Sequence, residues 1–252
     1  VMNIVSWNLN GLPSCLKNGS INELQAYHPD IICLQETRTR AEPVVFDGYR
    51  HYWHHSERDK YSGTAVLMCE EPLSVHYGLT EDFDDTEGRA ITVELKKFFL
   101  LNVYVPNSQQ NFYPHAYRRE WDEAMRAYVH ELLYDKPVMI CGDFNVARDN
   151  DLDIYPENTR LYWAGQGYAS DERSNFETLL EEGFEDVFRS FYPDVRSYRW
   201  WSNRLYNRKE GRGWRLDYFL VSDELMESVR DVVHLQDVYG SDHCPILLEV
   251  AE

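Results

Sequence analysis

The strongest constraint on the fold of this chain is a series of short apolar runs, rich in β-branched residues and separated by turn-forming residues. Runs of four to eight residues with this composition predict β-strands. Eight strands are predicted in this way, at Asn3–Trp7, Ile31–Gln35, Thr64–Cys69, Ala90–Leu95, Phe98–Val105, Val138–Cys141, Leu216–Val221 and Ile246–Val250. So many strands must bury their apolar side chains against one another, which favours packed sheets.

Two longer segments have apolar residues at helical spacing, Tyr113–Tyr134 and Ser170–Glu182. Weaker helical patterns occur at Asn18–Tyr27 and Asp223–Val229. Strands therefore outnumber helices, and no linker or repeat interrupts the chain. We expect an α/β protein with two packed sheets flanked by helices, forming a single domain over residues 1–252.

Polar side chains stand at or near the point where several predicted strands stop. A polar residue at one strand end is a turn signal, but carboxylate, amide, phenol and imidazole groups on separate strands predict one convergent site. The residues concerned are Asn8, Asn10, Glu36, Tyr104, Asn107, Asp143, Asn145, Asp217, Asp242 and His243.

These residue types suit metal-dependent hydrolysis of a phosphodiester. Mg²⁺ takes oxygen ligands and keeps several waters, so it needs only one or two protein carboxylates. Glu36 is the predicted ligand, with Asn8 and Asn10 beside it. Asp143 could orient or deprotonate the attacking water, with Asn145 holding its geometry.

His243 needs a partner that fixes its tautomer if it is to contact a phosphate oxygen. Its neighbour Asp242 is a poor candidate, because adjacent side chains on a strand point to opposite faces. Asp217 lies inside a predicted apolar strand, where a buried carboxylate needs a partner. We therefore predict that Asp217 pairs with His243 and that Asp242 faces the metal.

The net charge of −18 argues against nucleic acid as a ligand, because most nucleic-acid-binding proteins are basic. The charge is uneven, however. Residues 196–215, here called the basic segment, carry seven basic residues and one acid, interleaved with Tyr and Trp. This pattern, which includes Arg208, favours a surface for a phosphate backbone. The alternative is a solvated loop in which guanidinium groups stack on aromatic rings.

The five cysteines are odd in number and scattered, which predicts free, buried thiols in a reducing compartment. No apolar run reaches membrane-spanning length, and the first residues do not resemble a signal peptide. We expect a monomer that does not bind membranes. It would be cytoplasmic and nucleoid-associated in a bacterium or archaeon, or nuclear in a eukaryote.

Motifs along nearly the whole chain resemble the exonuclease III / abasic-site endonuclease family of the endonuclease/exonuclease/phosphatase superfamily. GDFN and SDH occur across the superfamily, whereas WRLDYF, WNLNG and YVPN are more specific to its DNA-repair branch. In order, the motifs are SWNLNGL (6–12), PDIICLQET (29–37), YSG (61–63), EGRAI (87–91), NVYVPN (102–107), REWDEA (119–124), ICGDFNVA (140–147), GWRLDYFLVS (213–222) and GSDHCPI (240–246).

The resemblance implies a four-layer α/β/β/α sandwich and dependence on Mg²⁺, for which Mn²⁺ can substitute. It implies cleavage of the phosphodiester 5′ to abasic sites in double-stranded DNA during base excision repair. It further implies 3′-phosphodiesterase and 3′→5′ exonuclease activity on 3′-blocked or recessed ends. The metal, water-activating and imidazole roles fall on the residues named above, and Tyr104 matches a phenol that contacts phosphate.

The remaining expected site residues contact DNA or line an apolar pocket for the extruded sugar. They are Tyr61, Arg89, Asn107, Asn158, Trp200, Arg208, Trp214 and Leu216. The loops at 108–110 and 153–168 depart from the family pattern, and Asn158 is placed within the second of them.

Two other interpretations remain open. The same chemistry could serve chiefly as a 3′→5′ exodeoxyribonuclease, or act on RNA or other phosphoesters, since the departing loops affect substrate contacts. A DNA-binding or scaffolding protein with a dead site would lack at least one of Glu36, Asp143, Asp217 and His243. All four are present.

Overall fold

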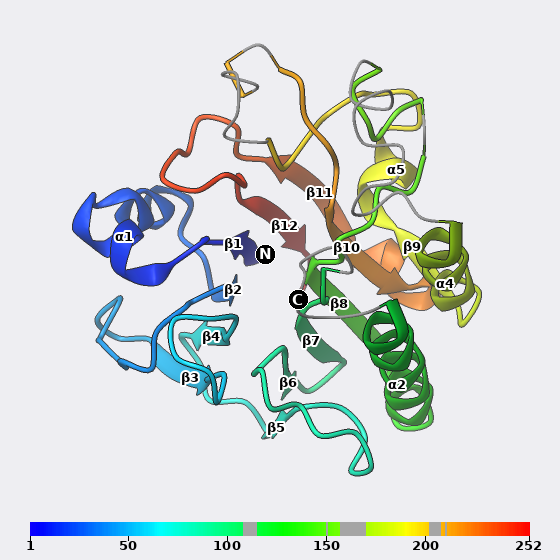
Figure 1. The fold of residues 1–252 in the computed structure, drawn as a ribbon, viewed down its shortest axis with the longest axis horizontal. Helices are drawn as coiled ribbons and strands as arrows, with labels where there is room; N and C mark the ends of the chain where they lie inside the picture. The colour runs from blue at the N-terminus through cyan, green and yellow to red at the C-terminus, as the bar shows by residue number, and fades with distance from the viewer. Residues whose placement is uncertain (108–114, 150, 157–169, 202–207, 210) are drawn as a thin grey trace.

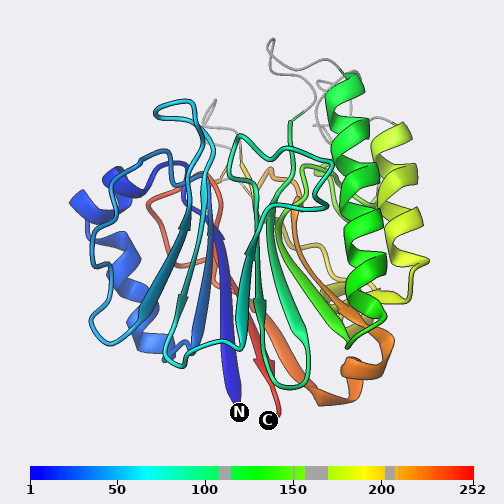
Figure 2. The same ribbon diagram turned by 90° about the horizontal axis from the view of Figure 1, so that it is seen from below.

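The computed structural model describes residues 1–107, 115–149, 151–156, 170–201, 208–209 and 211–252. Within these residues the chain forms two six-stranded sheets that pack face to face (Figure 1). Figure 2 shows short helices on the outer face of one sheet and two long helices on the outer face of the other. The expected four-layer α/β/β/α sandwich is therefore confirmed.

The first sheet has the strand order β11-β12-β1-β2-β4-β3, and the second has the order β5-β6-β7-β8-β10-β9. The strands of the first sheet are β1 (Met2–Asn8), β2 (Ile31–Gln35), β3 (Arg50–His54), β4 (Thr64–Met68), β11 (Val229–His234) and β12 (Ile246–Val250). Those of the second are β5 (Ser74–Tyr77), β6 (Ala90–Glu94), β7 (Phe99–Tyr104), β8 (Val138–Asp143), β9 (Phe184–Asp186) and β10 (Asp217–Ser222).

Helix α1 (Leu12–Lys17) and the 3₁₀ helix η1 (Ser20–Tyr27) cover the first sheet. Helices α2 (His115–Leu133) and α4 (Ser170–Leu180) cover the second. The short α5 (Val187–Phe191) packs against β10 and β11, and η3 (Asp223–Ser228) follows β10. The two weaker helical patterns of the sequence thus form 3₁₀ rather than α-helix.

Alternation of side chains along the strands builds three apolar layers. Along β2, Ile31 and Cys33 lie in the core between the sheets, whereas Ile32 and Leu34 pack under α1 and η1. Successive side chains of a strand point to opposite faces, so a strand covered on both faces must be apolar throughout. This explains why the central strands appear in the sequence as continuous apolar runs.

The four strands that sequence analysis missed are β3, β5, β9 and β11, which are the four edges of the two sheets. Edge strands pair on one side only and are more exposed, so their sequences mix polar and apolar residues. β3 reads RHYWH and β9 has three residues.

The strand directions gather the polar strand ends at one end of the sandwich. β1 runs parallel to β2, and β7 runs parallel to β8, so these four strands finish together. β10 and β12 run antiparallel to them, so the residues that precede these strands arrive at the same end. Figure 2 places both chain termini at the opposite end.

All five cysteines are free, and four of them are buried, while Cys69 is exposed. Among the described residues, no helix combines the length and apolar character that crossing a membrane requires.

Candidate active site

Three of the expected site residues lie side by side in the register of the second sheet. Tyr104 on β7 is paired with Asp143 on β8, which is paired with Asp217 on β10. The strands approach closely here because Gly142 precedes Asp143. A Cβ at Gly142 would lie 1.9 Å from the carbonyl oxygen of Val103, and its φ of 135° disfavours other residues.

His243 is held by Asp217, as the sequence led us to expect. Its Nδ1 lies 2.7 Å from Oδ2 of Asp217, while its Nε2 lies 3.7 Å from Oδ2 of Asp143 and 3.8 Å from Oδ1 of Asp242. Burial acts to lower the pKa of His243. The adjacent carboxylates, Asp217 first among them, outweigh burial and raise the pKa well above its usual value.

The argument that separated Asp242 from His243 was wrong, although its conclusion holds, because the partner of His243 Nδ1 is Asp217. Residues 240–245 form a loop rather than a strand, so the alternation argument does not apply there. The carboxylate of Asp242 reaches the Nε2 side of His243 and also accepts a 3.1 Å hydrogen bond from Trp200 Nε1. Asp242 therefore shares the space in front of the imidazole instead of facing away from it.

The carboxylate of Asp143 is fixed by hydrogen bonds to both of its oxygens. Asn8 donates to Oδ2 from its side-chain Nδ2, and Asn145 donates to Oδ1 from its backbone, each at 2.9 Å. Burial, then the charge of Asp217, raises the pKa of Asp143 to about 8, and Glu36 adds to the shift. Three buried carboxylates this close together favour a bound cation.

The side chain of Asn8, a predicted metal ligand, is oriented by hydrogen bonds within the protein. Its side-chain oxygen accepts a hydrogen bond from the backbone of Asn10, and its amide nitrogen is directed at Asp143. Both polar atoms are thus used within the protein. Asn8 positions Asp143.

Glu36 follows β2 and is joined to the row on the second sheet by Tyr104. The Tyr104 hydroxyl donates to Oε1 of Glu36, and Arg38 Nη2 lies 3.7 Å from Oε2. Burial, then the charge of Glu36, raises the pKa of Tyr104 well above its usual value, so the phenol keeps its proton. Glu36 is the carboxylate that bridges the two sheets.

Backbone strain accompanies these roles. Asn10, Glu36 and Asn145 have φ values of 49°, 51° and 47°, in the left-handed region. Such conformations cost free energy for residues other than glycine and tend to occur where function demands a fixed direction. All three lie one or two residues after a strand end, at the same end of the sandwich.

An apolar cluster lies beside His243. Trp214 and Leu216 are buried, and the half-buried Trp200 packs edge-on against Trp214 with ring centroids 6.2 Å apart. Trp200 also forms a β-bridge with His243. The residues expected to line a pocket for an extruded sugar are therefore brought together next to the imidazole.

The expectation that Arg89 contacts DNA was wrong. Arg89 is 1 % exposed, and its Nη2 donates to Oε2 of Glu87 at 2.6 Å. It also donates to the carbonyl oxygen of Tyr104 and the hydroxyl of Tyr61, each at 3.1 Å. The Arg89 guanidinium is therefore hydrogen-bonded within the protein, and one of these bonds holds the backbone of Tyr104.

Two arginines of the basic segment, Arg199 and Arg215, are buried. Arg215 is fully buried between Asp153 and Asp186, at 2.7 Å from each, and burial lowers the pKa of Arg199 to about 10. Arg208 lies over the rings of Trp201 and Tyr239 at 4.7 and 4.0 Å.

Its guanidinium also donates to three backbone carbonyls. For Arg208, the stacking alternative describes the structure better than a free phosphate-binding surface. Sequence could not reveal this, because buried and exposed arginines look alike in a polar segment.

The other expected contacts are only partly placed. Tyr61 and Asn107 are half-buried near the same end of the sandwich. Asn158 lies outside the described residues. Sequence analysis missed Arg118 on α2. Its buried guanidinium contacts the loop that contains Asn145. The sequence signal that could have identified Arg118 is a charged residue at a helix position that faces the core.

Residues 5–243 match the sequence profile of the endonuclease/exonuclease/phosphatase family. The chain belongs to that family. Curated relatives are similar to it over nearly the full length of this chain. An exodeoxyribonuclease of Bacillus subtilis is 42% identical over 251 residues, which is 98% of each chain. The DNA repair nuclease APEX1 of Danio rerio is 41% identical over 258 residues, covering 99% of this chain and 82% of the relative.

Solved structures agree with this family assignment. An abasic-site endonuclease from Leishmania major superposes with a TM-score of 0.88 at 28% identity, covering 100% of this chain and 88% of the other. The 3′ phosphatase NExo from Neisseria, bound to a product DNA hairpin, gives a TM-score of 0.86 at 27% identity, with both chains fully covered.

Proposed function

We propose that this protein is a metal-dependent DNA-repair nuclease that hydrolyses the phosphodiester 5′ to abasic sites in double-stranded DNA. It would also remove 3′-blocking groups and degrade DNA from 3′ ends. The observation that carries the proposal is the pairing of Asp217 with His243, opposite an Asp143 held by two asparagines. The names of the relatives, an exodeoxyribonuclease, a DNA repair nuclease and an abasic-site endonuclease, support DNA as the substrate.

In this proposal the protonation state of each side chain sets its role in the reaction. Asp143, with both oxygens oriented, would align the attacking water and take its proton. His243, held protonated between carboxylates, would donate a hydrogen bond from Nε2 to a phosphate oxygen, where negative charge develops. Asp217 fixes the orientation of the ring and favours its protonated form. The Tyr104 hydroxyl faces the same space and would contact the phosphate.

The donor set fits a hard divalent cation. Glu36, Asp143, Asp217 and Asp242 offer carboxylate oxygens, which Mg²⁺ and Mn²⁺ prefer. Within the described residues, the ligand atoms of Asp143, Asp217 and His243 lie within 4.8 Å of one another.

His243 already bonds to Asp217 and retains a proton, so it is a poor ligand. We infer instead that Mg²⁺ is held by Glu36, with Asp242 and Asn10 beside it. When bound, the ion would neutralise charge on the phosphate.

Selectivity for abasic sites would come from the cluster of Trp200, Trp214 and Leu216. A sugar without a base can enter an apolar recess where an intact nucleotide would clash. The protein would act as a monomer, since the site is assembled from one chain. We also propose that it works where the cell keeps its DNA, in the cytoplasm of a bacterium or archaeon or in a eukaryotic nucleus.

The test uses a labelled duplex with one abasic-site analogue, beside an undamaged duplex with a recessed 3′ end. Each is incubated with Mg²⁺, with EDTA, and with the Asp143→Asn variant. A single Mg²⁺-dependent nick 5′ to the abasic site, lost in the variant, is expected. A 3′ ladder without the nick would favour the exonuclease alternative. No cleavage of either DNA would contradict the proposal and direct the assay to RNA and phosphate monoesters.

A further inference from the structure

Arg118 on α2 is a buried guanidinium, 3 % exposed, that reaches two loops of the candidate site. Its Nη1 donates to the carbonyl oxygen of Pro106 at 2.9 Å and to that of Asn145 at 3.4 Å. Its Nη2 donates to the carbonyl oxygen of Phe144 at 2.9 Å. Pro106 belongs to the loop after β7, and the other two belong to the loop after β8. One side chain therefore joins both loops to the helix layer.

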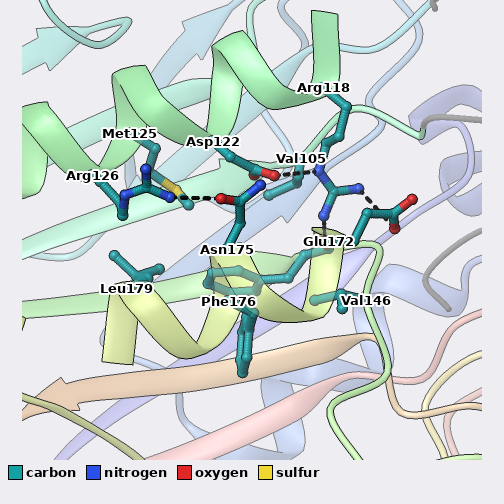
Figure 3. A pocket seen from close by; sticks show the side chains of 11 residues that line it. Val105, Arg118, Asp122, Met125, Arg126, Val146, Glu172, Asn175, Phe176 and Leu179 are labelled. Carbon is teal, nitrogen blue, oxygen red and sulfur yellow. Dashed lines mark hydrogen bonds and ion pairs between the residues drawn. The ribbon is translucent and has the colours of Figure 1, made fainter. Parts of the chain in front are cut away.

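The other side of Arg118 is anchored by two acids, as Figure 3 shows. Its Nε lies 3.0 Å from Oδ2 of Asp122, one turn along α2, and its Nη1 lies 3.5 Å from Oε2 of Glu172 on α4. Both acids are buried. The cavity around them has a volume of about 10 Å³, which leaves room for one water at most. The guanidinium therefore fills its site.

The two loops are also tied to each other and to Asp143. Asn145 donates from Nδ2 to the carbonyl oxygen of Val105 at 2.8 Å and from its backbone to Oδ1 of Asp143 at 2.9 Å. Val105 donates from its backbone to the carbonyl oxygen of Asp143 at 2.8 Å. A shift of the peptide at residues 144–145 would consequently turn the Asp143 carboxylate.

We propose that Arg118 is a positioning residue, whose guanidinium clamps the loops after β7 and β8 to α2 and thereby fixes the direction of Asp143. Arginine is suited to this role because its planar fork carries five donors in fixed directions. Lysine would keep the charge near Asp122 and Glu172 but cannot reach both loops at once. The kinetic test of this inference rests on the proposed function.

The experiment compares Arg118→Lys with Arg126→Lys as a matched control. Arg126 lies two turns further along α2 and donates to Oδ1 of Asn175 on α4 at 2.9 Å. Thermal unfolding is measured first, and all rates are taken where every variant is folded. Single-turnover cleavage of the abasic duplex is measured at saturating Mg²⁺, and Kd for the same DNA is measured in EDTA.

We expect Arg118→Lys to lower the single-turnover rate by about 10²-fold, as small misplacements of reacting groups do, with Kd within about twofold of wild type. Arg126→Lys should stay near wild type in both. A wild-type cleavage rate in Arg118→Lys would show that Arg118 only compensates the charges of Asp122 and Glu172, and would overturn the inference.

Hydrogen exchange separates this inference from the proposed function. If wild-type protein leaves abasic DNA intact, the proposed function fails, and the clamp is then judged by amide exchange alone. Peptides spanning residues 140–147 should exchange at least about tenfold faster in Arg118→Lys than in wild type or Arg126→Lys, because the loop loses its anchor. Equal exchange in the three proteins would overturn the clamp.

Discussion

His243 and Asp217 are joined by a 2.7 Å hydrogen bond between Nδ1 and Oδ2, although 26 residues separate them in the chain. On the other side of the imidazole, Nε2 lies 3.7 Å from Asp143. The ring is therefore held with one nitrogen committed to Asp217 and the other directed at the space where a phosphate would bind. The consequences of this arrangement can be measured.

Replacing Asp217 by Asn should remove the charge that keeps His243 protonated and oriented, while leaving the shape of the site intact. We expect the single-turnover rate to fall by about 10²- to 10⁴-fold, by analogy with other oriented imidazoles. DNA affinity should change little. The control is Asp223→Asn, an exposed carboxylate at the start of η3. A rate within a few-fold of wild type would show that the pair is structural.

The place of the metal can be read from two Mg²⁺ titrations. Glu36→Gln should raise the Mg²⁺ concentration for half-maximal activity by about 10- to 100-fold, because a ligand is lost. Asp143→Asn should lower the maximal rate and leave that concentration nearly unchanged. If Asp143→Asn instead raised the half-maximal Mg²⁺ concentration and Glu36→Gln did not, the ion would be bound by the cluster of Asp143, Asp217 and His243.

Arg89→Met should leave the Glu87 carboxylate buried without its cation. Removing one partner of a buried ion pair costs about 3–5 kcal/mol, so the free energy of unfolding in urea should fall by an amount of that order. The double variant with Glu87→Gln should recover part of the loss. A destabilisation below about 1 kcal/mol would mean that the pair is solvated in solution.

The same variant tests whether Arg89 contacts DNA. A lost phosphate contact would reduce the slope of log Kd against log salt concentration by about 0.9. Because Arg89 is buried, we expect the slope of Arg89→Met to match that of wild type. A slope reduced by one contact would restore the original expectation from the sequence.

His234 should make the fold sensitive to acid. Its ring stacks on Phe188 with centroids 4.1 Å apart, and burial, followed by the charge of Arg199, lowers its pKa well below the usual value. Below about pH 6.5, His234 therefore binds a proton in the unfolded chain but stays neutral in the folded chain. The contribution of neutral His234 to the free energy of unfolding is therefore fully present above that pH and is lost as the pH falls.

We expect His234→Gln to flatten this dependence between about pH 6.5 and 5, measured by urea unfolding at each pH. The exposed His28 serves as the control in the variant His28→Asn, which should follow the wild-type curve. Parallel curves for wild type and His234→Gln would show that the imidazole accepts its proton inside the fold.

The sequence predicted the central strands and the chemistry of their ends for a physical reason. A strand covered on both faces must be apolar throughout, so a polar residue directly after it stands out. Asp143 at the end of β8 and Glu36 directly after β2 were found in this way. The edge strands β3, β5, β9 and β11 lacked that signal, since one-sided pairing and exposure relax the demand for apolar residues.

What only the tertiary structure decided is where each charge lies. Arg89 and Arg215 look like phosphate-binding residues in the sequence, yet both are buried against carboxylates. Asn8 was predicted beside the metal, and only the structure shows that its amide nitrogen donates to Asp143. Sequence determines which groups are present and which elements carry them. Burial and the partners contributed by distant strands determine whether a charge meets substrate, metal or another side chain, because those partners come together only when the two sheets pack.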